Sequence, residues 1–252
     1  MEFTGERIIP ESKSTAPGTP PYEEHAARYR FAAGFVRDKE VIDIACGAGY
    51  GSKILRQAGA LKVVGCDIAE DAVEHAKSYY SIQGITFQVM DAANILFPDD
   101  SFDCVVSFET IEHVENYQKV IGEFYRVLRT GGLLIISTPN KDEYLRGNEK
   151  HDNPFHTQEF LKDEFLAILK RYSDVQLFSQ RLPRKIGLSR KILRGWVKVA
   201  AHLDRMNMRR KVLSKDLISS MSYAIDTHTS ELDPIPYQDG HSPLCFIAVC
   251  KK

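Results

Sequence analysis

The chain has 252 residues and a mass of 28.5 kDa, the size of one large domain or of one domain with an appendage. Hydrophobic residues make up 43% and charged residues 27%, which excludes disordered and fibrous proteins, and the formal charge of -1 argues against a general nucleic-acid binder. That charge is an average. Residues 181–215 hold twelve basic residues and one acidic residue, whereas the rest of the chain holds 21 basic and 33 acidic residues. The sequence therefore predicts a basic patch on an acidic body.

The cysteines and the N-terminal sequence indicate the compartment. Five cysteines occur without a Cys-x-x-Cys pair, which is typical of free thiols in a reducing compartment. The N-terminus lacks the pattern of a signal peptide, and no apolar run reaches the roughly 20 residues that span a bilayer. We expect a cytoplasmic protein without a transmembrane segment. The basic segment leaves a peripheral membrane contact open.

The apolar pattern predicts an alternation of strands and helices. Residues 1–21 are rich in Pro, Ser, Thr and Gly and predict an irregular arm, which a helix follows at 22–36. Strands are predicted at 41–45, 61–66, 85–90, 103–108, 132–138, 174–179 and 244–250, and further helices at 51–58, 70–80, 115–129 and 157–171. This alternation favours an α/β fold with a parallel sheet, helices on both faces and an antiparallel last strand.

Residues 181–242 form a long interval before the last strand, and we interpret them as a basic helical insertion in a single domain of residues 1–252. Apolar residues from Ile192 to Leu203 recur on one helical face with Arg and Lys between them. Such a helix can lie on an anionic membrane, contact phosphates of a linked sugar or of RNA, or cover the active site as a lid. We favour the lid, with phosphate recognition by some of its arginines. An RNA site would favour exposed aromatic residues among the charges, and Trp196 instead lies on the apolar face.

A glycine-rich loop carries the strongest local signal. The strand at 41–45 continues directly into Gly47, Gly49 and Gly51, where glycines permit a tight turn and close approach of a ligand. Asp67 ends the next strand, where a carboxylate is placed to accept hydrogen bonds from two ribose hydroxyls. A dinucleotide site needs G-x-G-x-x-G, and here the third glycine comes one residue early.

The spacing D43-x-x-x-G47-x-G49-x-G51 resembles the first motif of class I S-adenosylmethionine-dependent methyltransferases, with Ala45 in place of the family's usual first glycine. The segments FPDDSFDCVVSF at 97–108 and RVLRTGGLLIIST at 126–138 resemble further parts of that fold. The resemblance implies an enzyme with a Rossmann-like, seven-stranded mixed sheet that uses S-adenosylmethionine. It implies that the residues binding this donor are Asp43, Ala45, Gly47, Gly49, Asp67, Ile68, Asp91, Ala92 and Phe108.

A cluster of carboxylates and imidazoles follows the fourth predicted strand. Glu109, Glu112 and His113 lie where ligands bind in open α/β sheets, and one helical turn would bring them together as ligands of a divalent cation. The pattern E-x-x-E-H followed by H-x-x-E-F, which contains His156, resembles that of small-RNA 2'-O-methyltransferases, and ubiquinone-pathway O-methyltransferases carry a similar E-x-x-E-H. The resemblance implies that Glu109, Glu112, His113 and His156 bind Mg²⁺ or Mn²⁺.

A bound cation lowers the pKa of a hydroxyl and positions it, so we expect metal-assisted O-methylation of a vicinal diol, on a sugar or glycan. In this interpretation Glu109, Glu112 and His113 are also the catalytic residues. Alternatives stay open: His113 acts as a metal-free general base, the two carboxylates favour a helix N-terminus, or His156 is structural. The other functions considered are methylation of RNA ends or of a catechol-like molecule, and a donor-binding regulator without transfer activity.

The first thirty residues contain two further segments, FTGERIIP at 3–10 and EHAARYRF at 24–31. They resemble the start of methyltransferases found among bacterial glycan-biosynthesis proteins. This resemblance implies a small-molecule or glycan acceptor, free or linked to a nucleotide or lipid. It also implies that the N-terminal helix closes over the donor and that Arg28 pairs with its methionine carboxylate. The alternative is a solvated arginine on an amphipathic helix.

Overall fold

The computed structural model describes residues 7–142, 155–180, 232–239 and 243–252. The chain divides into two compact units, one of residues 1–181 and 233–252 and the other of residues 182–232. Apart from residue 232, every described residue belongs to the first unit. The predicted basic helix, with the charge of 181–215, lies outside the described residues, so its three interpretations stay predictions.

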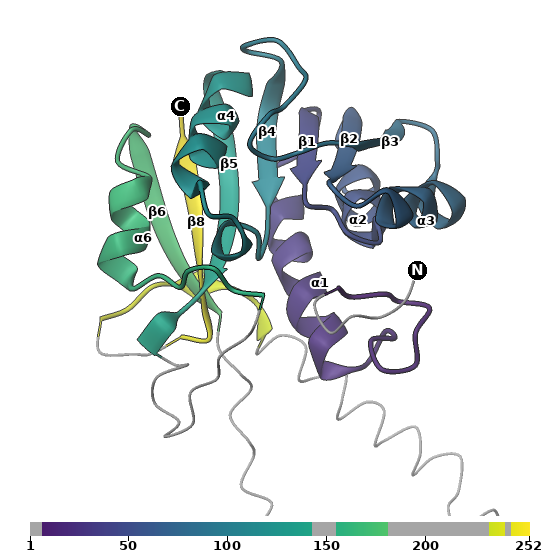
Figure 1. Cartoon of the computed structure of the whole chain (residues 1–252), viewed down its shortest axis with the longest axis horizontal. Coiled ribbons are helices and arrows are strands. Elements are labelled where there is room, and N and C mark those ends of the chain that lie inside the picture. Colours follow the sequence, from purple (N-terminus) through teal and green to yellow (C-terminus); the bar gives the residue numbers. More distant parts are fainter. Residues whose placement is uncertain (1–6, 143–154, 181–231, 240–242) are drawn as a thin grey trace, which may run out of the picture. The chain divides into compact units, whose positions relative to one another are not determined.

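One mixed sheet forms the centre of the first unit, with the strand order β3-β2-β1-β4-β5-β8-β6-β7 (Figure 1). The strands are β1 (Glu40–Ile44), β2 (Lys62–Asp67), β3 (Ile85–Val89), β4 (Phe102–Ser107), β5 (Leu128–Pro139), β6 (Asp174–Gln180), β7 (Ile235–Pro236) and β8 (Cys245–Lys251). Strands β1 to β5 pair in parallel, and β8 is antiparallel to both β5 and β6, so β6 runs in the same direction as β5. The predicted mixed sheet with an antiparallel last strand is confirmed. The two-residue β7 is an addition that the apolar pattern did not predict.

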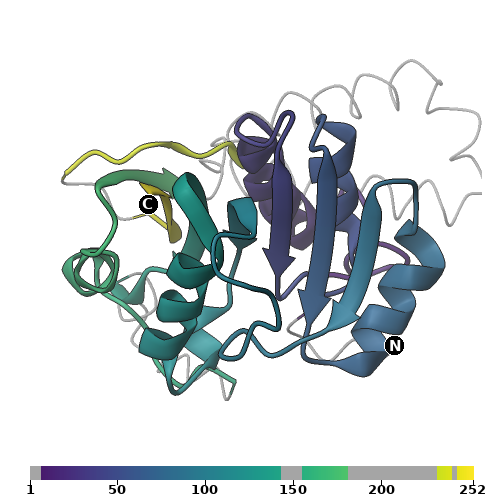
Figure 2. The same cartoon turned by 90° about the horizontal axis from the view of Figure 1, so that it is seen from above.

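Helices cover both faces of this sheet (Figure 2). They are α1 (Pro20–Ala33), α2 (Tyr50–Gln57), α3 (Glu70–Tyr80), the 3-10 turn η1 (Ile111–His113), α4 (Tyr117–Val127) and α6 (Lys162–Ile168). The side chains of successive strand residues point to opposite faces. In β1, Val41 belongs to the core under α1, α2 and α3, and the next residue, Ile42, belongs to the core under α4 and α6. Continuous apolar runs in these strands follow from burial on both sides.

Three predicted helices differ by two residues or more from those observed, and the one predicted at 22–36 spans Pro20–Ala33. The helix predicted at 157–171 spans only Lys162–Ile168, because the Leu161 N–H donates to the Glu164 side chain and not to the Thr157 carbonyl, and the Phe160 carbonyl accepts from the Lys141 N–H. The helix predicted from residue 115 begins at Tyr117, where the side chain of Asn116 accepts a hydrogen bond from the Lys119 N–H and caps its first turn.

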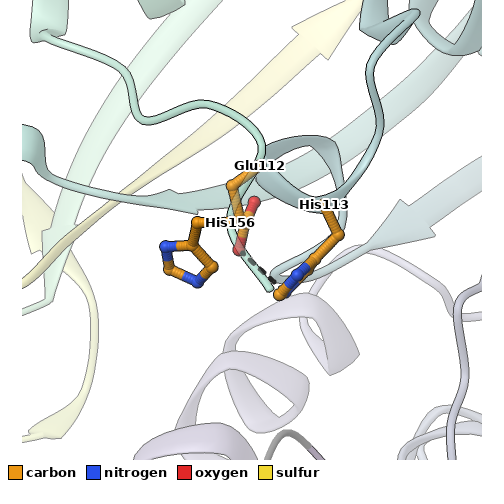
Figure 3. Close-up of side chains that lie close together, drawn as sticks. All are labelled: Glu112, His113 and His156. Atoms are coloured by element: carbon orange, nitrogen blue, oxygen red, sulfur yellow. Dashed lines mark ion pairs between the residues drawn. The ribbon is translucent and has the colours of Figure 1, made fainter. Parts of the chain in front are cut away.

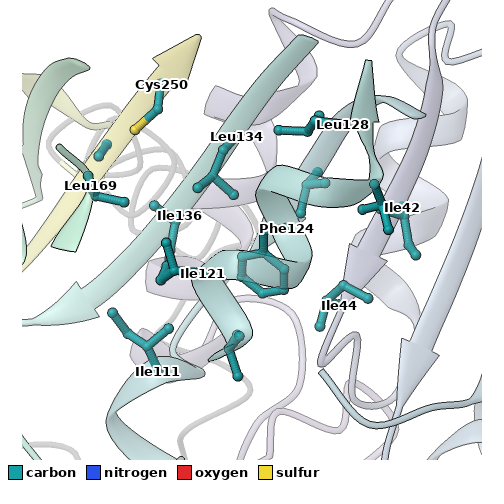
Figure 4. Close-up of a cluster of buried hydrophobic side chains, with 14 of the residues drawn as sticks. Ile42, Ile44, Ile111, Ile121, Phe124, Leu128, Leu134, Ile136, Leu169 and Cys250 are labelled. Atoms are coloured by element: carbon teal, nitrogen blue, oxygen red, sulfur yellow. The ribbon is translucent and has the colours of Figure 1, made fainter. Parts of the chain in front are cut away.

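The core beneath α4 is close-packed around Phe124 (Figure 4). Phe124 is fully buried among aliphatic side chains of β1, β4 and β5. Because α4 leads directly into β5, its apolar face also fixes the start of that strand. This packing holds the end of β4, and therefore η1, in place beneath the cavity described below.

Replacing Phe124 tests this role. We expect Phe124→Ala to lower the free energy of unfolding by about 3–5 kcal/mol, since it removes buried surface and leaves a void. Leu61→Ala is the matched control, because Leu61 is 64% exposed and its truncation should change stability by less than about 0.5 kcal/mol. Urea unfolding followed by circular dichroism measures both. Equal stability losses would contradict the assignment of Phe124 to the core.

Candidate functional site

The loop between β1 and α2 takes a backbone conformation that its sequence permits. Ala45, Gly47 and Gly49 all have positive φ, of 58°, 54° and 90°. A Cβ on Gly49 would lie 2.6 Å from the Cβ of Ala76, so this position requires glycine for space as well as for conformation. Ala45 occupies a left-handed conformation that glycine adopts at lower cost. The chain thereby turns sharply and leaves the backbone at Gly47 open to a ligand.

Asp67 joins this loop to the end of β2. Its Oδ2 accepts a hydrogen bond from the Gly47 N–H at 2.9 Å, and its Oδ1 accepts one from the Ala69 N–H at 3.0 Å. The carboxylate is therefore oriented by two backbone donors before any ligand binds. Each oxygen keeps a lone pair that can accept a further hydrogen bond.

A cavity of about 800 Å³ lies at the carboxyl ends of the parallel strands. Most of the predicted donor-binding residues line it, together with two of the predicted catalytic residues. These are Ala45, Gly47, Asp67, Ile68, Asp91, Ala92, Phe108, Glu109 and His113. The remaining predicted site residues do not line it, namely Asp43, Gly49, Arg28, Glu112 and His156. The structure thus brings the loop, the ribose-binding candidate and the carboxylate cluster to one cavity.

Asp43 lies behind the glycine loop and fastens it. Its fully buried carboxylate accepts hydrogen bonds from the Ser52 hydroxyl at 2.6 Å and from the Tyr29 hydroxyl at 3.1 Å. Burial raises the pKa of Asp43 to about 7, and the charge of Asp67 adds to this, although both hydrogen bonds lower it. Gly51 makes the contact with α1 sterically feasible, because a Cβ there would lie 2.0 Å from the Tyr29 ring.

Arg28 is placed differently from the predicted carboxylate clamp. The side chain is 2% exposed and does not line the cavity. Its Nε donates to Gln180 Oε1 at 2.8 Å, and its Nη2 lies 3.9 Å from Glu109 Oε2. A role at the methionine carboxylate stays a prediction. In the described structure Arg28 joins α1 to the end of β6 and to Glu109.

Three cavity-lining side chains of the N-terminal region did not emerge from the sequence as site residues: Arg7, Ile8 and His25. His25 lies one helical turn before Tyr29, which also lines the cavity. Burial and then the neighbouring Arg28 cation hold the pKa of His25 well below its usual range, so this imidazole is neutral near pH 7. The spacing of four residues between His25 and Tyr29 could have placed His25 on the cavity side of the helix. Arg7 and Ile8 lie in a segment without a helical or strand pattern, so the sequence offered no such signal for them.

Glu112, His113 and His156 lie close together (Figure 3), and His113 also lines the cavity. One ligand atom from each lies within 4.8 Å of the others. Glu112 is fully buried, its Oε2 accepts a hydrogen bond from Thr138 at 3.2 Å, and its Oε1 has no hydrogen-bond donor within the described residues. Burial, followed by the charge of Glu109, raises the pKa of Glu112 well above its usual range. A buried carboxyl group between two imidazoles suits either a shared proton or a cation.

The backbone of η1 brings His156 to this cluster. The Glu112 carbonyl accepts hydrogen bonds from the N–H groups of Thr157 and Gln158, at 2.8 and 3.1 Å, and from the Thr157 hydroxyl. His113 Nδ1 lies 3.0 Å from the carbonyl oxygen of Phe155. The two histidine rings pack edge to face with their centroids 4.9 Å apart. Segments 45 residues apart in sequence are therefore held together at one point.

Glu109 takes a separate position. Its backbone lies in the left-handed region, with φ of 48°, and its Oε1 accepts a hydrogen bond from the Ser137 hydroxyl at 2.7 Å. Its other oxygen faces Arg28. Glu109 lines the cavity and does not belong to the three-residue group of Glu112, His113 and His156. The structure thus assembles three of the four predicted metal ligands.

Comparison with known proteins identifies the central part of the chain. Residues 42–136, which contain β1 to β5, match the family model described as methyltransferase domain. This segment has the class I methyltransferase fold. A SAM-dependent methyltransferase of Thermotoga maritima has a TM-score of 0.60 at 15% identity, with 92% of each chain covered. One of Archaeoglobus fulgidus has a TM-score of 0.58 at 18% identity, with 92% of this chain and 93% of that chain covered. At these identities the likeness shows the fold alone.

Several curated relatives of this chain come from mycobacteria. A probable S-adenosylmethionine-dependent methyltransferase of Mycolicibacterium smegmatis is 32% identical over 170 residues, which cover 68% of this chain and 64% of that protein. One of Mycobacterium tuberculosis is 35% identical over 171 residues, covering 67% of this chain and 60% of that protein. The chain thus spans less than two thirds of the length of these relatives.

None of the helices in the described ranges has the length and apolar character needed to cross a bilayer.

The raised pKa of Asp43 predicts a specific pH dependence of stability. A carboxyl group whose pKa rises from 3.8 to about 7 on folding stabilises the fold at low pH, and this contribution is lost as the pH rises through 7. Relative to Asp43→Asn, the wild-type free energy of unfolding should fall by about 3 kcal/mol between pH 5 and pH 8. Urea unfolding at each pH measures the difference between the two proteins.

Asp103→Asn is the matched control for this pH dependence. Partial burial raises the pKa of Asp103, but the Glu40 N–H and the Arg129 guanidinium outweigh it and hold the value below the usual range. The Asp103 carboxylate is then ionised in the folded and unfolded states throughout pH 5–8, so its difference curve should be flat. A flat curve for Asp43→Asn as well would show that the buried carboxyl group is not protonated.

Proposed function

We propose that the protein is an S-adenosylmethionine-dependent methyltransferase whose donor occupies the cavity at the carboxyl ends of β1, β2 and β4. One observation carries this proposal. A single cavity is lined by Gly47 and Asp67 at one part and by Glu109 and His113 at another. A donor molecule there would contact the glycine loop, and its methyl group would face the polar cluster. The mycobacterial relatives, whose names give this donor, support the assignment.

The lining residues support one orientation of the donor. The ribose hydroxyls would donate to Asp67, whose carboxylate is already oriented by Gly47 and Ala69. The adenine would lie beside Ile68, a cavity-lining apolar side chain that is 69% exposed, and near Asp91 and Ala92. The sulfonium would then point toward Phe108 and Glu109 at the end of β4. Holding donor and acceptor in line at this point would supply much of the rate.

We further propose that Glu112, His113 and His156 bind a divalent cation such as Mg²⁺ or Mn²⁺. The residues present fit such an ion, because they supply one carboxylate and two imidazoles within 4.8 Å. Glu112 Oε1 is buried without a hydrogen-bond donor in the described structure, and a cation would satisfy it. When bound, the ion would lower the pKa of an acceptor hydroxyl and fix the orientation of two neighbouring hydroxyls. Glu109 would remain on the cavity side, held by Ser137 and Arg28.

The acceptor that we propose is a vicinal diol on a sugar or glycan. A cation at the rim selects acceptors that present two oxygens together, which a diol does and an isolated hydroxyl does not. The polar side chains of Glu109, Thr110 and His113 line this end of the cavity and suit hydroxyl groups. A catechol or the ribose diol of an RNA end has the same arrangement of oxygens.

A second candidate is transfer without a metal, and one observation favours it. The cavity is lined by His25 and His113, whereas Glu112 and His156 do not line it. An imidazole that faces the acceptor can take the proton of a hydroxyl directly as a general base. In that case Glu112 would be protonated and structural, as its raised pKa permits. The following two experiments separate the candidates.

Metal binding can be measured without any acceptor. Titration of the metal-free protein with Mn²⁺, followed by electron paramagnetic resonance, should show one site. Glu112→Gln should weaken this binding at least tenfold, since it removes the anionic ligand. Glu74→Gln is the matched control, because Glu74 is an exposed carboxylate that does not line the cavity and should leave the affinity within twofold. Equal Mn²⁺ affinity of the wild type and Glu112→Gln would remove the metal proposal.

Transfer should depend on both the cation and the diol. With methyl-labelled donor we expect methylation of catechol or of methyl glycosides with a free vicinal diol, at least tenfold faster with Mg²⁺ or Mn²⁺ than with EDTA. The same compounds with one hydroxyl of the pair already methylated should be poor acceptors. Transfer that EDTA does not reduce would favour the metal-free base. Donor binding without transfer to any diol, including a short RNA, would favour a regulator.

A further inference from the structure

The segment before α1 forms part of the cavity wall on its ribose side. Arg7 and Ile8 line the cavity together with Asp67 and Ile68. The Arg7 guanidinium lies 3.8 Å from Asp67 Oδ1 and 3.6 Å from Asp71 Oδ1. Both distances exceed the range of a good hydrogen bond. The N–H groups of Arg7 therefore lie near these two carboxylates without forming hydrogen bonds to them. The side chain is 28% exposed and remains accessible to a ligand.

Residues 8–15 are fixed to the fold and do not trail from it. Ile8 packs against the core under α1 and α2, and Ile9 is buried. The hydroxyl of Thr15 closes a loop by donating to the Ile9 carbonyl at 2.7 Å. Glu11 Oε1 accepts a hydrogen bond from the Tyr80 hydroxyl, and Glu11 Oε2 lies 3.1 Å from Nε2 of His75 in α3. Arg7 is therefore presented to the cavity by a segment that is already ordered, which reduces the entropy lost when a ligand binds.

We propose that Arg7 is a donor-binding residue that lies beside Asp67 and, together with it, holds the two ribose hydroxyls. This inference rests on the donor assigned under the proposed function and is independent of the acceptor and of the metal. It adds a residue from outside the glycine loop and the strand ends to the donor site.

The chemistry of the two side chains is complementary toward a diol. A carboxylate only accepts hydrogen bonds, so each ribose hydroxyl would donate its proton to Asp67. The hydroxyl oxygens then keep lone pairs, and a guanidinium only donates, so Arg7 would donate to these oxygens from its position beside the carboxylate. A bound ligand would shield the Asp67 carboxylate from water. The positive charge of Arg7 would then compensate the negative charge of Asp67. Asp71 lies beside Arg7 but does not line the cavity.

Binding of S-adenosylhomocysteine, measured by isothermal titration calorimetry, tests the proposal. Arg7→Gln should raise Kd about tenfold, as the loss of a charge-assisted hydrogen bond does. Arg7→Lys should give an intermediate Kd, because it keeps the charge and loses the fork. Asp71→Asn is the matched control: it removes the other carboxylate beside Arg7, is 56% exposed at its side chain, and should change Kd less than twofold.

An analogue separates a ribose contact from a structural role. With S-(3'-deoxyadenosyl)homocysteine, Arg7→Gln should cost less than threefold, because one of the hydroxyls that Arg7 holds is absent. Thermal unfolding checks that each variant is folded. If Arg7→Gln is not folded, Arg7→Lys serves for the same comparison. An equal loss with both ligands, or no loss with either, would overturn the role of Arg7 while leaving the donor assignment intact. Failure of the wild type to bind S-adenosylhomocysteine would remove both.

Discussion

A buried carboxyl group, Asp43, joins three of the elements that surround the cavity. It belongs to β1, accepts hydrogen bonds from Ser52 of α2 and Tyr29 of α1, and is fully withdrawn from water. Water cannot replace either donor at such a site, so the positions of the glycine loop and of α1 depend on each other. The left-handed residues of the loop and the absence of a side chain at Gly51 permit this contact. The cavity is therefore shaped largely by interactions that lie behind its surface.

The rim of the cavity depends in a comparable way on the Glu112 residue. Its carbonyl oxygen holds the segment that carries His156, and its side chain is buried between two imidazoles. The backbone of Glu112 thus builds the cluster, while its carboxyl group gives the cluster its chemistry. These roles are separable, since replacing the carboxylate by an amide keeps the backbone bonds. This separation explains why Glu112→Gln is informative where a deletion of the turn is not.

The sequence predicted the sheet and the loop well, because both rest on local rules. Apolar runs and their spacing determine strands buried on two faces, and glycine has few reasons to recur at Gly47 and Gly49 other than a tight turn. The long-range contacts were less accessible. Nothing near Arg28 in the sequence indicates that Gln180, 152 residues later, occupies its Nε. The same holds for Glu109, whose side chain turns to Ser137 and Arg28 because its backbone enters the left-handed region. Arg7 lies in a segment without periodicity, so only its contacts reveal it.

The two ends of the cavity differ in what holds them. At the end where the donor is proposed to bind, backbone N–H groups orient Asp67, and the glycine loop is held by Asp43, a buried carboxyl group whose pKa burial raises to about 7. At the acceptor end the arrangement depends on side chains whose state varies, because Glu112 must either keep a proton or receive a cation. In the proposed function, the state of Glu112 would therefore act at the end of the cavity where transfer takes place, away from the carboxylate of Asp67 that would hold the donor.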